Sequence, residues 1–401
     1  MTGSSLPSEL WRSIFRYAVY VPHLFDVNWA YEPEETLWEG WNVVKDSQAV
    51  TRRAITQVCR EWKELGSEFL HEFIEIPVDE EEEFGHLLAS FKASEMASRS
   101  KIGYGWWTKR IDCPVALFME GQEGPLLSIL DLCHNLQIFS VPGVGMVDTS
   151  VQIRVARLLE TRFRHSLRRV DLLLQGDELD PTMDYAAVLP DVRLQSLGMT
   201  IREPYLPHSL HPSLEGVTTL TLFLPAMVPD DPLPVFFPRL TTLALTQLGT
   251  GDIPSIRPFI NNHDKTLANV YVHEGAVSIS SIYHLISGCV SIKTLTFHQT
   301  AFRSVPLSKV DGTSVQYLGI LCLSAGIKRS QLVAVERLVS SGAFADLRAI
   351  RLLGITNPIL SHTADWEKAI EHCGVYRVKL QDVHGRSIVV RKELKTPGVD
   401  G

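Results

Sequence analysis

Apolar residues recur through most of the chain in one short pattern, apolar-x-x-apolar-x-apolar. Its first positions lie 23 to 32 residues apart, and a period of 20–29 residues is typical of leucine-rich repeats, in which each unit contributes a short strand. The matching triplets are Thr108–Ile111–Cys113, Leu136–Phe139–Val141, Leu167–Val170–Leu172, Leu194–Leu197–Met199, Val217–Leu220–Leu222, Leu240–Leu243–Leu245, Leu267–Val270–Val272, Ile292–Leu295–Phe297, Val315–Leu318–Ile320, Leu347–Ile350–Leu352 and Val375–Val378–Leu380.

Helical patterns lie between several of these triplets, over residues 151–163, 280–289, 329–342 and 363–373. A strand followed by a helix cannot bury its apolar face alone, but stacked copies bury a continuous core. A doubly wound sheet would not repeat the same triplet so often. The sequence therefore predicts an α/β fold over residues 105–390, an irregular leucine-rich-repeat-like solenoid with a parallel sheet on its concave face.

The last part of the chain departs from the repeat. Two runs of alternating apolar residues flank Gly385, which is typical of a hairpin. We expect this terminal hairpin to cover the last edge of the sheet, followed by a tail over residues 391–401.

The N-terminal part has helical spacing instead. Leu10, Ile14 and Ala18 recur every four residues after Pro7, and a second helix is expected over residues 51–70. An insertion at about 20–48, rich in Trp and Tyr, separates the two helices and is either packed or functional. We therefore expect a helical module over 1–76, which makes the whole chain α+β, and a linker or first repeat over 77–104.

Composition and charge narrow the function classes. The 401 residues are 45% hydrophobic and 21% charged, with a net charge of −8, which is ordinary for a globular protein and unfavourable for binding nucleic acid through phosphates. No apolar run approaches the ~20 residues that span a bilayer, and the start does not read as a signal peptide. We expect a cytoplasmic or nuclear protein that binds neither nucleic acid nor membrane.

Motifs for catalysis or metal binding are missing from the sequence. It contains no G-x-S-x-G, H-E-x-x-H, P-loop or G-x-G-x-x-G motif, and none of its six cysteines forms a C-x-x-C pair. We expect a non-catalytic protein without a cofactor or metal.

The N-terminal module carries a recognisable series of residues. Leu6, Pro7, Glu9 and Leu10 are followed by Ile14-Phe15 and, beyond the insertion, by Val58-Cys59-Arg60-x-Trp62. This series resembles both halves of an F-box, in order and with the right internal spacing. The insertion, which begins VPHLFD before Trp29, resembles that of the expanded F-box families of mushroom-forming fungi.

This resemblance implies a substrate-recognition subunit of an SCF-type (cullin-RING) ubiquitin ligase. The F-box would dock on the Skp adaptor, and through it on the cullin, while the repeats bind an unknown protein substrate. The alternative is a non-catalytic leucine-rich-repeat scaffold whose F-box-like helices only cap the solenoid. The residues expected to contact the adaptor are Leu6, Pro7, Leu10, Ile14, Phe15, Val58, Cys59 and Trp62.

A candidate substrate surface comes from the strand positions that point away from the core. Strand side chains alternate between two faces, and in the later repeats the outward positions collect aromatic, His and basic residues. They are either an ordinary solvated face or a surface for an acidic or phosphorylated segment. These residues are Tyr271, His273, His298, Tyr317, Arg351, Arg377 and Lys379.

Overall fold

The computed structural model describes most of the helical module and the strand of every repeat. The described residues are 6–21, 24–27, 47–76, 81–97, 103–118, 123–141, 148–172, 193–200, 212–224, 237–247, 256–272, 279–298, 314–321, 329–353, 363–382 and 385–388. Most of the predicted insertion, over residues 28–46, and the predicted tail over 391–401 therefore lie outside the described residues.

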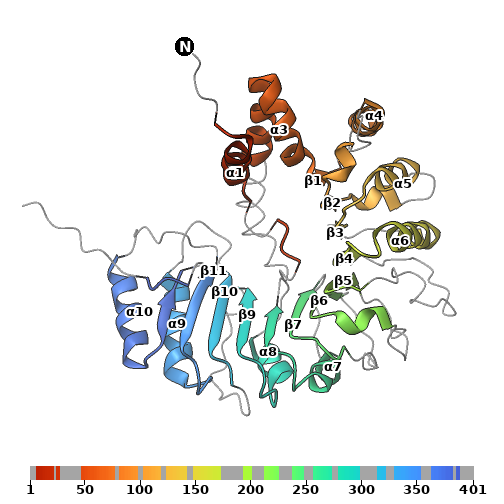
Figure 1. Cartoon of the computed structure of the whole chain (residues 1–401). Helices are drawn as coiled ribbons and strands as arrows, with labels where there is room; N and C mark the ends of the chain where they lie inside the picture. Colours follow the sequence, from red (N-terminus) through yellow and green to blue (C-terminus); the bar gives the residue numbers. More distant parts are fainter. Residues whose placement is uncertain are drawn as a thin grey trace, which may run out of the picture.

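A single parallel sheet runs through the described chain, with its strands side by side in sequence order. In Figure 1 it forms an arc whose inner face is lined by strands. This arrangement confirms the predicted α/β solenoid. The strands are β1 Phe73–Glu75, β2 Arg110–Asp112, β3 Ile138–Ser140, β4 Arg169–Leu172, β5 Ser196–Thr200, β6 Thr219–Leu224, β7 Thr242–Gln247, β8 Asn269–Val272, β9 Thr294–His298, β10 Tyr317–Leu321, β11 Ala349–Leu353 and β12 Lys379–Gln381.

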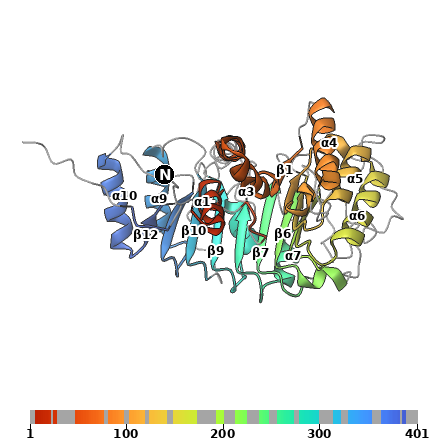
Figure 2. The same ribbon diagram turned by 45° about the horizontal axis from the view of Figure 1, so that its top comes forward.

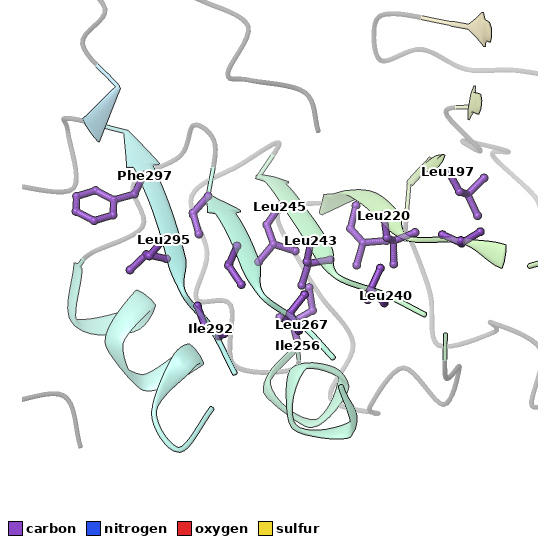
Figure 3. Close-up of a cluster of buried hydrophobic side chains, with 14 of the residues drawn as sticks. Leu197, Leu220, Leu240, Leu243, Leu245, Ile256, Leu267, Ile292, Leu295 and Phe297 are labelled. Atoms are coloured by element: carbon purple, nitrogen blue, oxygen red, sulfur yellow. The ribbon is translucent and has the colours of Figure 1, made fainter. Parts of the chain in front are cut away.

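From β2 to β11 the strands pair so that the middle residue of each apolar triplet lies opposite that of the next. Leu220 pairs with Leu243, for example, and Leu295 pairs with Leu318. These side chains are fully buried, and burying one leucine contributes roughly 1.5–3 kcal/mol. Figure 3 shows part of this core, which lies on the side of the sheet that faces the helices.

Helices cover the outer side of the arc (Figure 1). The four helices predicted from apolar spacing are present, as α6 Thr149–Phe163, α8 Ile279–Ile286, α9 Arg329–Ser341 and α10 Thr363–Val375. Asp148 begins α6 by accepting hydrogen bonds from the N–H groups of Ser150 and Val151. The other described helices on this side are α4 Glu81–Ala97, α5 Glu123–Leu132 and α7 Arg257–Asn262. The connections between strands also contain short 3-10 segments, η1 Tyr104–Trp106, η2 Val115–Phe118 and η4 Pro212–Gly216.

Both ends of the sheet differ from the sequence prediction. The sheet begins with β1, so it starts inside the segment assigned to the module rather than at residue 105. Helix α4 occupies the predicted linker and packs on α5. At the other end Leu380, not Val378, lies opposite Ile350, because a turn at Arg377 shifts the last repeat by two residues.

A short hairpin follows β12 at the predicted position. Gln381 and Ser387 form an antiparallel bridge, and the chain reverses at Gly385, whose φ of +74° is one that glycine adopts without strain. Arg386 donates two hydrogen bonds to the Asp382 carboxylate, which fixes the turn.

The N-terminal module contains α1 Ser8–Ala18, a helix over residues 47–58, and α3 Arg60–His71. The single helix predicted over 51–70 is therefore two helices. The backbone of Cys59 is extended, and its Sγ accepts a hydrogen bond from the Trp62 N–H, which starts α3 afresh. The module has a small core of its own, formed by Phe15, Val19, Ile55 and Phe69 with Trp11, Trp62 and Leu65 packed against it.

The chain that leaves α1 joins this module to the solenoid. Val21 and Leu24 pack with Phe73 of β1 in a second small apolar cluster. Arg110 of β2 donates a hydrogen bond to the Leu24 carbonyl at 2.9 Å, and its guanidinium lies over the Phe73 ring. Figures 1 and 2 show α1 and α3 on the inner side of the arc, near its N-terminal end.

Candidate interaction surfaces

Helix α1 exposes an apolar stripe. Leu6, Leu10 and Ile14 have 42%, 50% and 45% of their surface exposed. They are spaced four residues apart, so the side chains that α1 carries lie on one face, and Leu6 extends that face just before the helix. Exposed Tyr17 continues the stripe by one turn. Contiguous exposed apolar side chains are characteristic of a protein-binding surface.

The other predicted adaptor contacts divide into exposed and internal residues. Pro7 is exposed immediately before α1, Val58 is exposed at the end of the 47–58 helix, and Cys59 is exposed between the helices. Phe15, in contrast, is 1% exposed. The prediction that Phe15 contacts a partner is therefore wrong, because its ring is used within the core of the module.

Trp62 also packs mainly against residues inside the module. Its ring centroid lies 4.6 Å from that of Trp11 and 4.8 Å from that of Phe15. Half-buried Trp62 and the Phe15 ring thus brace α1 against α3, which fixes the direction in which the exposed stripe points.

The inner face of the sheet changes character along its length. In β2 and β4 it carries two buried ion pairs of the same kind, Arg110–Asp112 and Arg169–Asp171, each with its closest atoms 2.8 Å apart. In β6 and β7 its threonines are buried as well: Thr219, Thr221 and Thr242. On these strands the inner face is therefore largely closed to solvent.

The later strands carry exposed residues on the same face. Tyr271 on β8 is half-buried, whereas Tyr317 on β10, Arg351 on β11 and Lys379 on β12 are exposed. Register places Tyr317, Ala349 and Lys379 in one row across three strands. The structure thus brings together three of the seven predicted substrate residues on adjacent strands.

Tyr271 lies two strands away on β8, and the other three predicted substrate residues do not join this group of Tyr317, Arg351 and Lys379 either. Arg377 lies in the turn before β12 with a φ of 60°, so it is not a strand residue. His273 lies outside the described residues, and His298 ends β9 with a side chain outside the described set. The sequence pattern also missed Gly319 and Ala349, small residues whose importance depends on their neighbours across the sheet.

Reactive side chains in the described part of the chain include two buried cysteines and one Ser–His pair. Burial raises the pKa of the Cys133 thiol to about 12 and that of Cys373 to about 11, so both stay protonated at neutral pH. Ser340 Oγ lies 2.6 Å from His372 Nε2 but also donates to the Glu336 carbonyl, as in an ordinary contact between helices. Within the described residues, no three His, Cys, Asp or Glu side chains group as a metal site.

Comparison with known proteins leaves the family open. No family model and no curated protein matches the chain. Among solved structures it is similar to the leucine-rich repeat-containing protein LegL7 from Legionella pneumophila, with 10% identity and a TM-score of 0.39 over 79% of this chain and 99% of that chain. This likeness is too distant to identify a function. No helix in the described part of the chain is long and apolar enough to cross a membrane.

Proposed function

We propose that the chain is the substrate-recognition subunit of an SCF-type ubiquitin ligase in the cytoplasm or nucleus, and that it is not itself catalytic. Its N-terminal module docks on the Skp adaptor, which connects it to the cullin, and its repeats hold a protein substrate. The observation that carries this proposal is the exposed stripe of Leu6, Leu10 and Ile14. These residues belong to the series that resembles an F-box, and their exposure leaves them available to a partner.

Separate residues of the module form its core and its exposed apolar stripe, and this separation supports docking. Phe15 and Ile55 belong to a core that the module completes by itself, so the stripe on α1 is not needed to hold the helices together. A partner that covered these three side chains would remove their apolar surface from water. That burial would stabilise the complex by several kcal/mol.

The alternative, that the helices only cap a scaffold, is less well supported. A cap would turn its apolar face against the end of the sheet. The module does meet the end of the sheet, through Val21 and Leu24 on Phe73 and through His71 on Tyr104. Leu10 and Ile14 take no part in these contacts and remain exposed. The apolar cluster of the module is also separate from the core of the repeats.

Co-precipitation from cells tests the proposal. The tagged chain should recover the Skp adaptor and the cullin, and Leu10→Glu with Ile14→Glu should abolish both. A matched control, Arg53→Glu with Arg157→Glu, changes exposed positions on the 47–58 helix and α6 and should retain them. Recovery of adaptor and cullin by the α1 variant would contradict the proposal and favour the scaffold.

A further inference from the structure

We infer that the last three strands form a binding subsite for an anionic group, a carboxylate or a phosphate, on an extended peptide. The subsite consists of the exposed side chains of Tyr317, Arg351 and Lys379. They stand above Ala349 and Gly319, two small buried residues that we call the floor. This inference deepens the proposed function, on which it rests for the identification of the peptide as a substrate segment.

Register produces an alternation of large and small side chains. In one row Tyr317, Ala349 and Lys379 lie opposite one another, and in the next row Gly319, Arg351 and Gln381 do so. Adjacent strands are ~4.8 Å apart, so the backbones of Tyr317 and Lys379 lie about 10 Å apart, with the buried methyl group of Ala349 between them. Exposed Arg351 lies in the next row of the same strand as Ala349.

Gly319 contributes no side chain to the second row. A Cβ added at Gly319 would lie 2.4 Å from Thr296 Oγ1, so the space beside Thr296 admits no larger residue. Since Ala349 and Gly319 are diagonal neighbours across β10 and β11, the floor is continuous between the three large side chains.

The terminal hairpin fixes one wall of the subsite. A Cβ added at Gly385 would lie 3.0 Å from Arg351 Nη2 and 3.5 Å from Arg351 Cζ. The guanidinium therefore lies against the bare backbone of the turn, which limits its freedom before any ligand arrives. A preorganised guanidinium loses less conformational entropy on pairing with an anion.

Charge complementarity selects the ligand. Asp382, the acidic residue of the hairpin, is engaged by Arg386. Arg351 and Lys379 form no ion pair with the residues that the structure describes. The chain as a whole carries a net charge of −8. The exposed cations Arg351 and Lys379, beside the phenol of Tyr317, therefore make a locally positive surface on a negatively charged protein. Arg and Lys side chains pair strongly with carboxylate and phosphate.

Fluorescence anisotropy with defined probes tests the subsite on the full chain. The probes are a labelled peptide of ten glutamates, a labelled Gly/Ser decapeptide with one central phosphoserine, and the same decapeptide without phosphate. At least one anionic probe should bind more tightly than the neutral one, and its affinity should fall as salt rises above about 0.1 M. The stronger anionic probe identifies carboxylate or phosphate as the preferred group.

Two variants alter the subsite, one in its charge and the other in the size of a side chain. Arg351→Gln with Lys379→Gln removes both cations. Ala349→Leu enlarges a buried floor residue, which displaces the side chains above it without changing charge. Each should weaken binding of the anionic probe at least tenfold. The matched control, Lys92→Gln with Arg337→Gln, removes two exposed cations from α4 and α9 and should bind as the unaltered chain does. Thermal melting verifies that each protein is folded. If Ala349→Leu does not fold, the variant Arg351→Gln with Lys379→Gln provides the test alone.

The inference is overturned if no anionic probe binds better than the neutral probe, or if the control weakens binding as much as the subsite variants. Adaptor binding measured on the same preparations separates the two proposals. Loss of the anion site with adaptor binding intact rejects only the subsite. An intact anion site in a chain that does not bind the adaptor rejects the ligase assignment and leaves a peptide-binding solenoid.

Discussion

Ile14 and Phe15 are neighbours in α1, yet one is exposed and the other is 1% exposed. A helix turns by about 100° per residue, so adjacent side chains point to different surroundings. The series that resembles an F-box marks both residues without separating them, because a sequence motif records identity and order rather than direction. Burial in three dimensions assigns Phe15 to the core and leaves Ile14 on the exposed face that we propose for adaptor binding.

His71 provides a prediction at the scale of a single residue. Its ring stacks on Tyr104 with centroids 4.0 Å apart and meets Phe91 edge-on, and burial lowers the pKa of His71 to about 4. The pKa in the unfolded chain is about 6.5, so between these values the unfolded state binds more protons. Stability should therefore fall by on the order of 2 kcal/mol as pH decreases from 7 to 4.

Urea denaturation at a series of pH values measures this effect. His71→Phe should flatten the part of the pH dependence between pH 4 and about 6.5, whereas replacing the exposed His165 with Gln should leave it unchanged. If His71→Phe keeps the full acid sensitivity, another group is responsible.

At the scale of the element, the repeated triplet is sufficient to predict strands and their pairing. Leu243 of β7 and Leu295 of β9 are buried as the triplet requires. The pattern fails where other constraints act. β1 lies beside the helical module and has no full triplet, and the turn at Arg377 shifts β12 by two residues. The register places three of the predicted substrate residues on adjacent strands. The role proposed for Gly319 and Ala349 depends on that register, which the apolar pattern alone does not show.

Substitutions on opposite faces of the sheet test the assignment of the strands. Leu243→Ala should cost roughly 2–5 kcal/mol of unfolding free energy, because it leaves a cavity in the core. Thr294→Ala on the inner face should cost less than ~1 kcal/mol, since Thr294 is half-buried. Chemical denaturation of both variants gives the comparison, and equal costs would show that the two faces are misassigned.

At the scale of the whole molecule, the module and the repeats are joined by a buried polar contact. Arg110 pairs with Asp112 through two hydrogen bonds of 2.8 and 3.0 Å and reaches the Leu24 carbonyl with its remaining nitrogen. Lys109 adds an ion pair with Glu72 at 2.6 Å. Under the proposed function, such a joint would hold the module in one orientation relative to the substrate surface.

Removing this joint should loosen the N-terminal segment. Arg110→Met with Asp112→Leu deletes both charges, which avoids the 3–5 kcal/mol cost of a lone buried charge, but it also removes the hydrogen bond to Leu24. Hydrogen–deuterium exchange should increase in peptides that contain Leu24 and Phe25. The equivalent change at Arg169 and Asp171 is the control and should not increase exchange there. Unchanged exchange in the first variant would mean that Arg110 does not hold the joint.

The most direct test of the ligase assignment is a calorimetric titration of the purified chain with the Skp adaptor. The unaltered protein should bind, and Leu6→Ala with Pro7→Ala should weaken the affinity more than tenfold, about 1.4 kcal/mol. Because both residues are exposed, the melting temperature should not change. An adaptor affinity that is immeasurable for the unaltered chain, or identical in the double variant, would contradict docking through this face.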